Sequence, residues 1–375
     1  MRVLVAGGGT GGHFYPALAI AEGLKHRYPD AEIDYIGTKQ GIEARVLADY
    51  PWIRFHPIHV RGLSRRGRWR NVFVLLQLVV AFAETLRVFL KHRPTMVVGV
   101  GGYSSFPPVF LAAVLGRVFP ISTMIHEQNV LPGVANRWLS RFVDLVLISF
   151  PESRRSFPHA RKIAVTGNPI REEFLHVKRS EREYRWFGLD PARRTILVFG
   201  GSKGSDEITE QIRSAKRLIA ESPDLQILLV TGDSSSATAI RDEMTTCGIS
   251  NVVVTDYVER MGAAFAIADL VVCRAGATSL AEITACGKAS ILVPWREATD
   301  DHQWENARRL EQADACALAD DEVIVSRGLV GLILDLMHDE WRLARVAGNA
   351  ARLGQGEANS RVLGEIQALM RGAGA

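Results

Sequence analysis

Three stretches of this sequence carry a short apolar strand directly into a cluster of glycines: VLVAGGGTGGH (residues 3–13), MVVGVGGYSS (96–105) and ILVFGGSKG (196–204). Glycine lets a ligand approach the backbone closely. The N–H groups at the start of the next helix then point at an anion, with the positive end of the helix dipole behind them. Any one of these turns can be a strand-to-helix connection without a ligand, but three together predict a site that handles several phosphate groups.

Two common nucleotide-binding classes fit the glycines poorly. The first cluster matches Gly-x-Gly-x-x-Gly at Gly7, Gly9 and Gly12, but a dehydrogenase would have an acidic residue ending the second strand about 20 residues later. Asp34 instead lies inside the expected strand, with apolar residues after it. The P-loop pattern Gly-x-x-x-x-Gly-Lys-Ser/Thr is absent from the sequence, so a P-loop nucleotidase is not supported.

Length and composition indicate an ordinary globular protein. A chain of 375 residues is too long for one typical core and suits two domains. Its four cysteines form no C-x-x-C pair and no metal-ligand spacing, which favours a reducing compartment. Met1 and Arg2 lead at once into a strand, leaving no apolar segment for a signal peptide. These features favour the cytoplasm.

Strands and helices alternate along the chain, which predicts parallel sheets with helices on both faces. Strands are expected near residues 2–6, 32–37, 96–100, 122–126 and 145–148, and again near 195–199, 226–231, 251–254, 270–273 and 290–293. We expect one domain over residues 1–166 and a second over 167–350, with the charged segment 178–194 near the junction. Two such domains facing each other would bind ligands at the carboxyl ends of their strands.

A basic tract precedes an apolar run in the first half. Five arginines fall within ten residues, interleaved with Trp69: Arg61, Arg65, Arg66, Arg68 and Arg70. The apolar residues 72–83 that follow are too few to span a bilayer, which takes about 20. Basic residues beside an aromatic ring can instead hold a protein at an anionic lipid surface. The alternative is a solvated loop in front of a buried helix.

The second half contains the most specific pattern, VVCRAGATSLAE (271–282), followed by DDHQWEN (300–306). This pattern predicts a strand, a tight turn and a helix whose first turn can hold a diphosphate. Glu282 can accept two hydrogen bonds from a ribose diol. Alternatively, Ser279 and Glu282 form a capping box, but the turn at Gly276 predicts a helix start before Ser279.

With these motifs the chain resembles the MurG family of UDP-N-acetylglucosamine transferases, nearly from end to end. His-Glu-Gln-Asn at 126–129 followed by Pro-Gly at 132–133 is highly specific to this family. The other matching segments are 8–13, 101–104, 136–137, 167–171, 200–204 and 273–282 with Gln303 and Asn306. Ser205, Thr209 and Phe106-Pro107 depart from the family's usual residues.

The resemblance implies a GT-B fold, with the donor in the C-terminal domain and the acceptor in the N-terminal one. It also implies that a C-terminal helix, at about 355–375, packs back on the N-terminal domain. Residues expected at UDP-GlcNAc are Thr10, Gly11, Gly12, Asn129, Arg171, Ser202, Val258, Ala277, Thr278, Ser279, Leu280, Ala281, Glu282, His302 and Gln303. Those expected at the acceptor diphosphate are Gly101, Gly102, Tyr103 and Ser104. Arg65, Arg66, Arg68, Trp69 and Arg70 would meet inner-leaflet anionic phospholipid.

The implied reaction moves GlcNAc, with inversion, to the 4-hydroxyl of a lipid-linked MurNAc-pentapeptide, converting lipid I to lipid II for the cell wall. It would take place at the cytoplasmic face of the bacterial plasma membrane, with the enzyme peripheral and without nucleic acid. The sequence has no Asp-x-Asp, so we expect no metal cofactor and leaving-group stabilisation by helix dipoles and Arg171.

His13 is the first candidate base, because an ordinary imidazole titrates near physiological pH; it can equally be a residue that only hydrogen-bonds phosphate. Glu127 is the second candidate. Three other functions stay open: a UDP-GlcNAc 2-epimerase, a related lipid glycosyltransferase, and a nucleotide-sugar-binding subunit without catalysis.

Overall fold

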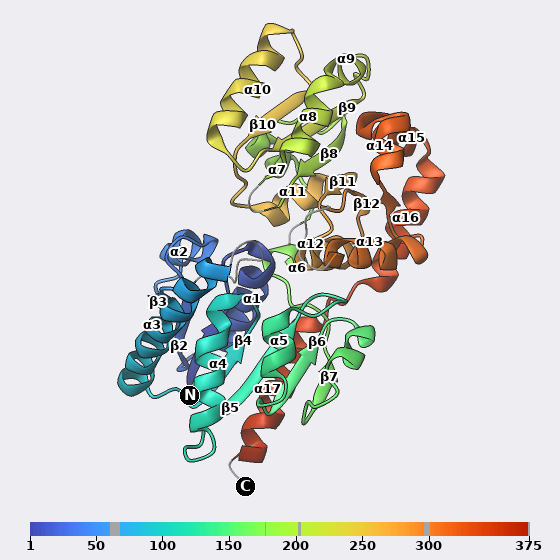
Figure 1. Cartoon of the computed structure of the whole chain (residues 1–375). Coiled ribbons are helices and arrows are strands. Elements are labelled where there is room, and N and C mark those ends of the chain that lie inside the picture. Colours follow the sequence, from blue (N-terminus) through green and yellow to red (C-terminus); the bar gives the residue numbers. More distant parts are fainter. Residues whose placement is uncertain (61–67, 177, 202–203, 296–300, 374–375) are drawn as a thin grey trace. The chain divides into compact units, whose positions relative to one another are not determined.

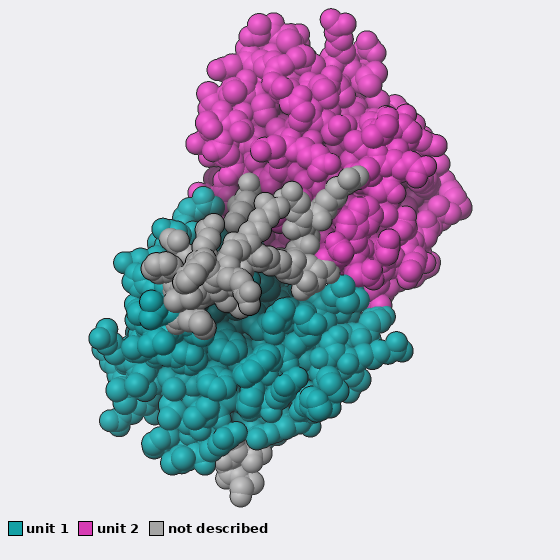
Figure 2. All heavy atoms as spheres, in the orientation of Figure 1, with its two compact units in different colours: residues 1–170, 357–375 teal, residues 171–356 magenta. Residues whose placement is uncertain are grey.

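The computed structural model describes residues 1–60, 68–176, 178–201, 204–295 and 301–373. The chain forms two compact units (Figures 1 and 2). Unit 1 contains residues 1–170 and 357–375, and unit 2 contains residues 171–356. The division thus falls after Ile170, four residues beyond the boundary expected from the sequence.

Unit 1 is built on a parallel seven-stranded sheet in the order β3-β2-β1-β4-β5-β6-β7. Successive residues of its central strands are buried on both faces, as expected for a sheet covered by helices on each side. The strands are β1 Arg2–Ala6, β2 Glu32–Thr38, β3 Ile53–Ile58, β4 Met96–Gly99, β5 Ser122–Glu127, β6 Leu145–Ile148 and β7 Ile163–Val165.

Helices cover both faces of this sheet (Figure 1). α1 and α17 pack on one face, with Phe14, Leu18 and Ile366 in a common core. α3, α4 and α5 pack on the other. The helices of unit 1 are α1 Gly11–Arg27, α2 Ile42–Val46, η1 Leu47–Asp49, α3 Arg68–His92, η2 Tyr103–Ser105, α4 Phe106–Leu115, α5 Val134–Leu139, η3 Pro151–Ser156 and α17 Ala358–Ala373.

Unit 2 repeats the design with a parallel six-stranded sheet in the order β10-β9-β8-β11-β12-β13. Its strands are β8 Arg194–Phe199, β9 Leu225–Val230, β10 Val252–Thr255, β11 Leu270–Cys273, β12 Ala289–Leu292 and β13 Ala317–Leu318. Its helices are α6 Glu173–His176, α7 Glu181–Phe187, α8 Asp206–Ser214, α9 Lys216–Ala220, α10 Ser234–Thr246, α11 Met261–Ile267, α12 Ala277–Ala285, α13 His302–Gln312, α14 Asp321–Arg327, α15 Leu329–His338 and α16 Glu340–Leu353.

The prediction of two doubly wound parallel sheets is confirmed. All ten strands expected from the sequence exist, and three more, β3, β7 and β13, lie at sheet edges. These edge strands lack the continuous apolar run that marks a buried parallel strand: β3 contains Pro57, and β7 and β13 have three and two residues.

The C-terminal helix α17 belongs to unit 1 although the chain reaches it only after completing unit 2. Val362 and Ile366 are buried against α1. Asn359 exchanges two hydrogen bonds with the backbone of Ile170, at 3.0 and 2.8 Å. Among the described helices, none has the length and hydrophobicity needed to cross a membrane.

Candidate active site

The glycine clusters lie where the strand order of each sheet reverses direction. In unit 1 this point is between β1 and β4, and the first two clusters follow these strands. In unit 2 it is between β8 and β11, followed by the third cluster and by the turn at Gly276. Open parallel sheets bind ligands at such switch points, outside the carboxyl ends of the strands. Each unit therefore has one candidate ligand-binding site, at the carboxyl ends of its central strands.

The loop between β1 and α1 is shaped by a buried carboxylate. Gly9 N–H donates to both carboxylate oxygens of Glu43, at 3.1 Å each. Thr38 donates to Glu43 Oε1 from its backbone N–H at 2.7 Å and from its hydroxyl at 2.8 Å. A Cβ at Gly8 would lie 2.3 Å from that carboxylate. The Gly9 N–H is therefore held by the protein's own anion rather than left for the phosphate of a ligand.

Gly12 has no packing reason to be glycine. A Cβ there would meet only the Thr10 hydroxyl, at 3.8 Å, within the described part of the chain. Thr10 is the N-cap of α1 in extended backbone, and its side chain makes no capping hydrogen bond. The first turn of α1 thus has open space beside a hydroxyl, at the place where the sequence predicts that Thr10, Gly11 and Gly12 contact the donor.

His13, in the first turn of α1, is fixed through one ring nitrogen. Its Nδ1 lies 3.1 Å from the backbone oxygen of Val100 and 3.1 Å from Gln128 Oε1. The ring packs against the second glycine cluster, because a Cβ at Gly101 would lie 2.8 Å from His13 Nδ1. A side chain at Gly101 would therefore displace the imidazole.

Glu127, the second candidate base, has both carboxylate oxygens occupied. Its Oε1 accepts from the backbone N–H of Asn129 at 3.0 Å and from its side-chain amide at 3.2 Å. Its Oε2 accepts from Gly133 N–H at 3.1 Å and from the Asn136 amide at 2.9 Å. Glu127 is only 1% exposed. This arrangement favours a role for Glu127 in holding residues 129–136 in place, with Asn129 partly exposed.

The loop expected at the acceptor diphosphate contains an unsatisfied hydroxyl. Gly101 and Gly102 both have positive φ, at 92° and 77°. Tyr103 is exposed, while Ser104 is buried and its hydroxyl has no hydrogen-bond partner within the described residues. A buried polar atom without a partner costs free energy, so it points to a ligand group that would supply one.

In unit 2 the corresponding candidate site is the first turn of α12, which follows β11. The helix begins at Ala277 with Gly276 as N-cap, so Ser279 is already inside it and no capping box with Glu282 exists. The preference for a helix start before Ser279 is confirmed. Gly276 has an ordinary φ of −69°, and within the described residues a Cβ there would meet nothing within 4 Å. Open space in front of a helix N-terminus suits an anionic ligand.

Glu282, one turn into α12, is 4% exposed. Burial raises its pKa to about 7, against the opposing charge and hydrogen bond of Arg171. Arg171 Nη2 donates to Glu282 Oε1 at 3.1 Å, and Arg171 Nη1 pairs with Glu173 at 2.7 Å. The structure thus brings Arg171 and Glu282 together, as a site for a diphosphate and a ribose would require.

The remaining predicted donor residues border this turn. Thr278 and Leu280 are buried on α12, with Ala277, while Ser279 and Ala281 are partly exposed. Val258 is buried before α11. His302 and Gln303 open α13, and Gln303 Oε1 accepts from Trp295 N–H at 3.0 Å.

Sequence reasoning quoted Asn306 only as part of a motif. Its amide donates to Ala275 O at 3.3 Å and so ties α13 to the turn at Gly276. Gln128, Asn136 and Glu43 were also given no role from sequence. Gln128 lies in the motif at 126–129 and Asn136 in the matching segment 136–137, and these were the available signals. Glu43 had none, because its contacts depend on a turn that brings residues 34 apart together.

Several predicted residues cannot be placed in full. Ser202, Arg65 and Arg66 lie outside the described residues. Arg68, Trp69 and Arg70 begin α3, for which only the backbone is described there.

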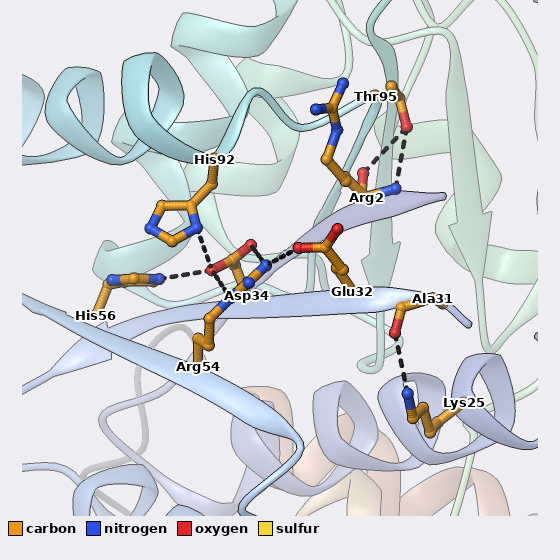
Figure 3. Close-up of polar contacts among 9 residues, drawn as sticks. All are labelled: Arg2, Lys25, Ala31, Glu32, Asp34, Arg54, His56, His92 and Thr95. Carbon is orange, nitrogen blue, oxygen red and sulfur yellow. Dashed lines mark hydrogen bonds and ion pairs between the residues drawn. The ribbon is translucent and has the colours of Figure 1, made fainter. Parts of the chain in front are cut away.

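A second polar cluster lies away from the carboxyl ends of the strands, between β2, β3 and the end of α3 (Figure 3). Asp34 is buried in β2, and its Oδ1 lies 2.7 Å from His56 Nε2 and 3.3 Å from His92 Nδ1. These three groups could ligate a metal. However, Arg54 donates to both Asp34 oxygens at 3.0 Å. A cation would have to displace that guanidinium, so we interpret the cluster as an ion-pair anchor for α3.

Comparisons with known proteins agree with this geometry. The glycosyltransferase family 28 N-terminal domain matches residues 3–148 and the family 28 C-terminal domain matches residues 195–362. Relatives named UDP-N-acetylglucosamine–N-acetylmuramyl-(pentapeptide) pyrophosphoryl-undecaprenol N-acetylglucosamine transferase are similar over nearly the whole chain. The protein from Desulforudis audaxviator is 38% identical over 98% of both chains. That from Desulfitobacterium hafniense is 40% identical over 97% of this chain and 98% of its own.

Solved structures agree as well. MurG of Acinetobacter baumannii superposes with a TM-score of 0.69 at 27% identity, over 98% of this chain and 99% of its own. The UDP-GlcNAc 2-epimerase of Neisseria meningitidis reaches the same TM-score at only 14% identity, over 98% of this chain and 100% of its own, which shows a shared fold alone. The fold is GT-B, and the chain belongs to the MurG family of UDP-N-acetylglucosamine-dependent transferases, within glycosyltransferase family 28.

Proposed function

We propose that the chain transfers GlcNAc from UDP-GlcNAc to the 4-hydroxyl of a lipid-linked MurNAc-pentapeptide, converting lipid I to lipid II in peptidoglycan synthesis. The observation that carries this function is the identity of 38% and 40%, over 98% and 97% of the chain, with transferases of that name. The geometry supports this function, because in each sheet the strand order reverses between two central strands, and open parallel sheets bind ligands at the carboxyl ends of such strands.

Unit 2 supplies the donor site. The carboxylate of Glu282 accepts two hydrogen bonds from the uridine ribose diol, and Val258 borders the uracil. The first turn of α12 and Arg171 hold the diphosphate, while Gln303 and His302 face the sugar hydroxyls. This assignment is supported by the open space at Gly276 and by the contact between Arg171 and Glu282 at 3.1 Å.

Transfer requires charge stabilisation on the leaving UDP. The bond from the anomeric carbon to the diphosphate breaks as the acceptor oxygen attacks from the opposite face, so negative charge grows on the diphosphate. Arg171 and the N-terminus of α12 meet that charge without a metal ion. Arg171 is already oriented by Glu173, at 2.7 Å, which reduces the reorganisation needed in the reaction.

His13 takes the proton from the acceptor hydroxyl. Among the described residues, the hydrogen-bond partners of its ring lie at Nδ1, whereas both oxygens of Glu127 already accept hydrogen bonds. The buried hydroxyl of Ser104 contributes a hydrogen bond to the acceptor's diphosphate.

The acceptor is a membrane lipid, so unit 1 must reach a bilayer surface. Exposed apolar side chains on α3 and α5 support this: Leu76 is 61% exposed, Val79 67% and Trp138 48%. Phe82 of α3 and Trp138 of α5 both contact Phe106 of α4, with ring centroids 6.4 and 6.2 Å apart. The three helices therefore present one apolar face.

Charge at this face favours anionic lipid. Arg137 and Arg141 are exposed beside Trp138. Basic residues around exposed aromatic and aliphatic side chains suit a peripheral protein on an inner leaflet rich in anionic phospholipid.

Incubation of the protein with UDP-GlcNAc and a lipid-linked muramyl pentapeptide tests the function, with UDP release and the disaccharide product measured. UDP release that requires the acceptor supports the transferase. Conversion of UDP-GlcNAc to its 2-epimer in the absence of acceptor would instead support the epimerase. Binding without turnover in either assay would support a subunit without catalysis.

A further inference from the structure

Gln128 connects His13 to a second, fully buried histidine. Its amide nitrogen lies 3.0 Å from Val100 O, 2.9 Å from His126 O and 3.0 Å from His126 Nδ1. Its Oε1 lies 3.1 Å from His13 Nδ1. His126 Nε2 in turn lies 2.9 Å from Gly167 O. The hydrogen bonds therefore run without a break from Gly167, through His126 and Gln128, to His13.

The chemistry of the two carbonyls fixes the direction of this chain. Carbonyl oxygens accept and cannot donate, so the Gln128 group that faces Val100 O and His126 O must be the NH₂. The opposite orientation would place three acceptor oxygens together. Gln128 Oε1 is therefore the atom that faces His13, and it accepts the Nδ1–H proton.

The state of His126 agrees with this direction. Its Nε2–H donates to the Gly167 carbonyl, and its Nδ1 accepts from the Gln128 amide, so the ring is neutral. Burial lowers the pKa of His126 to about 4, which keeps it neutral throughout the physiological range. A protonated His126 would put an N–H against the Gln128 NH₂ and break the chain.

The tautomer of His13 follows. Its Nδ1 faces two acceptors, Val100 O and Gln128 Oε1, so Nδ1 carries the proton. The neutral ring then has its lone pair on Nε2, which no described residue engages. Gly101 and Gly102 leave space for this ring orientation, since a Cβ at either would come within 3.4 Å of an imidazole atom.

We propose that Gln128 is a positioning residue that holds His13 as the Nδ1–H tautomer, with Nε2 free to take the proton of the acceptor hydroxyl. This inference rests on the proposed function for the identity of the proton donor, but the tautomer itself does not. When Nε2 takes the proton, the imidazolium keeps its Nδ1–H bonds to Val100 O and Gln128 Oε1, and no group has to reorient.

The tautomer can be measured without substrate, from the ¹⁵N shifts of the two ring nitrogens in protein labelled at its ten histidines. His13→Gln identifies the His13 signals by their disappearance. In the wild-type protein the neutral His13 ring should be protonated at Nδ1 and unprotonated at Nε2. An Nε2–H tautomer in the wild type would overturn the proposal even if the enzyme is fully active.

Two substitutions test whether Gln128 sets this state. Gln128→Leu removes one of the two acceptors at His13 Nδ1 and leaves Val100 O, so it should raise the share of the Nε2–H tautomer, with kcat about 10- to 100-fold lower and KM for UDP-GlcNAc within about twofold. Gln128→Glu keeps an acceptor toward His13, and its other oxygen must carry a proton because it faces Val100 O and His126 O. This variant should therefore keep His13 as the Nδ1–H tautomer, with kcat closer to the wild type than that of Gln128→Leu.

Gln226→Leu is the matched control. Gln226 is also a buried glutamine whose amide bonds to carbonyls, at 2.7 Å from Asp190 O, but it lies in unit 2 at β9. It should lower stability without changing the His13 shifts or kcat. If Gln128→Leu behaves like this control, Gln128 only supports the fold. If the wild type has the expected tautomer but transfers no sugar, the proposed function fails while the tautomer inference stands.

Discussion

Replacing Glu282 by Gln should weaken donor binding and at the same time stabilise the unliganded protein. The carboxylate is 4% exposed and pairs with Arg171, yet burial still raises its pKa to about 7 from 4.5. The folded state therefore binds a proton that the unfolded state releases between pH 4.5 and 7, so this group lowers stability as pH rises through that window. A difference of this size corresponds to roughly 3 kcal/mol at pH 8.

Glutamine keeps the shape but is neutral, so Glu282→Gln should raise the free energy of unfolding at pH 8 by up to about 3 kcal/mol. Its NH₂ cannot accept from a ribose hydroxyl, so UDP-GlcNAc binding should lose about 1.5 to 3 kcal/mol. The two effects have opposite signs, which separates a binding role from a structural one. Denaturant unfolding and calorimetry with UDP-GlcNAc measure them.

The same carboxylate predicts a pH dependence of binding. If only the ionised form accepts both hydroxyls, UDP-GlcNAc should bind the wild type about 30-fold more weakly at pH 5.5 than at pH 8.0. The diphosphate of UDP-GlcNAc has no ionisation in this range, so the change reports the protein. Glu282→Gln should lose this dependence, and Glu243→Gln, which removes a surface ion pair in the same unit, should keep it. Equal wild-type affinity at both pH values, or a destabilised glutamine variant, would refute the reasoning.

Four further outcomes are expected. Turnover should survive EDTA, because Arg171 and the α12 N-terminus carry the diphosphate charge; complete loss restored by Mg²⁺ would show otherwise. Asp34→Asn should cost about 1 to 3 kcal/mol of stability at pH 7 in urea unfolding, since the neutral amide keeps only one of the two oxygens to which Arg54 donates, with no change in UDP-GlcNAc affinity. Ser104→Ala should raise KM for the lipid acceptor several-fold and leave the UDP-GlcNAc Kd unchanged; an equal effect on both would place Ser104 elsewhere. Val79→Ser with Trp138→Ser should reduce co-sedimentation with anionic vesicles, more so at raised salt, while a soluble acceptor is still used; unchanged sedimentation would remove α3 and α5 from the membrane face.

The central strands could be predicted from sequence because each is buried on both faces and reads as a short apolar run. β3, β7 and β13 could not, since an edge strand needs fewer apolar residues and β3 even contains a proline. The division after Ile170 also has no local signal. It depends on Asn359 of α17 bonding to Ile170 across 189 residues.

In the candidate site, the sequence indicated candidate ligand-binding residues but not the partners that orient them. His13 was the first candidate base and Glu127 the second. The difference between them is a count of hydrogen bonds already made, and this depends on Gln128, Asn136 and backbone oxygens brought together by the sheet. The family motifs contain Gln128 and Asn136, but their spacing and composition do not say which atoms these side chains bond.

The glycines show the same limit. All three clusters predicted phosphate cradles, but several of their glycines are needed by the chain itself. A Cβ at Gly8 would meet Glu43, one at Gly101 would meet His13, and one at Gly204 would lie 1.9 Å from Thr231 O. At Gly12 and Gly276 a Cβ would meet nothing closer than 3.8 Å within the described chain. Where packing within the protein does not require a glycine at the start of a helix, close approach of a ligand to the backbone is the best explanation for it. We therefore expect anion binding at the first turns of α1 and α12 rather than at the glycine clusters as a whole.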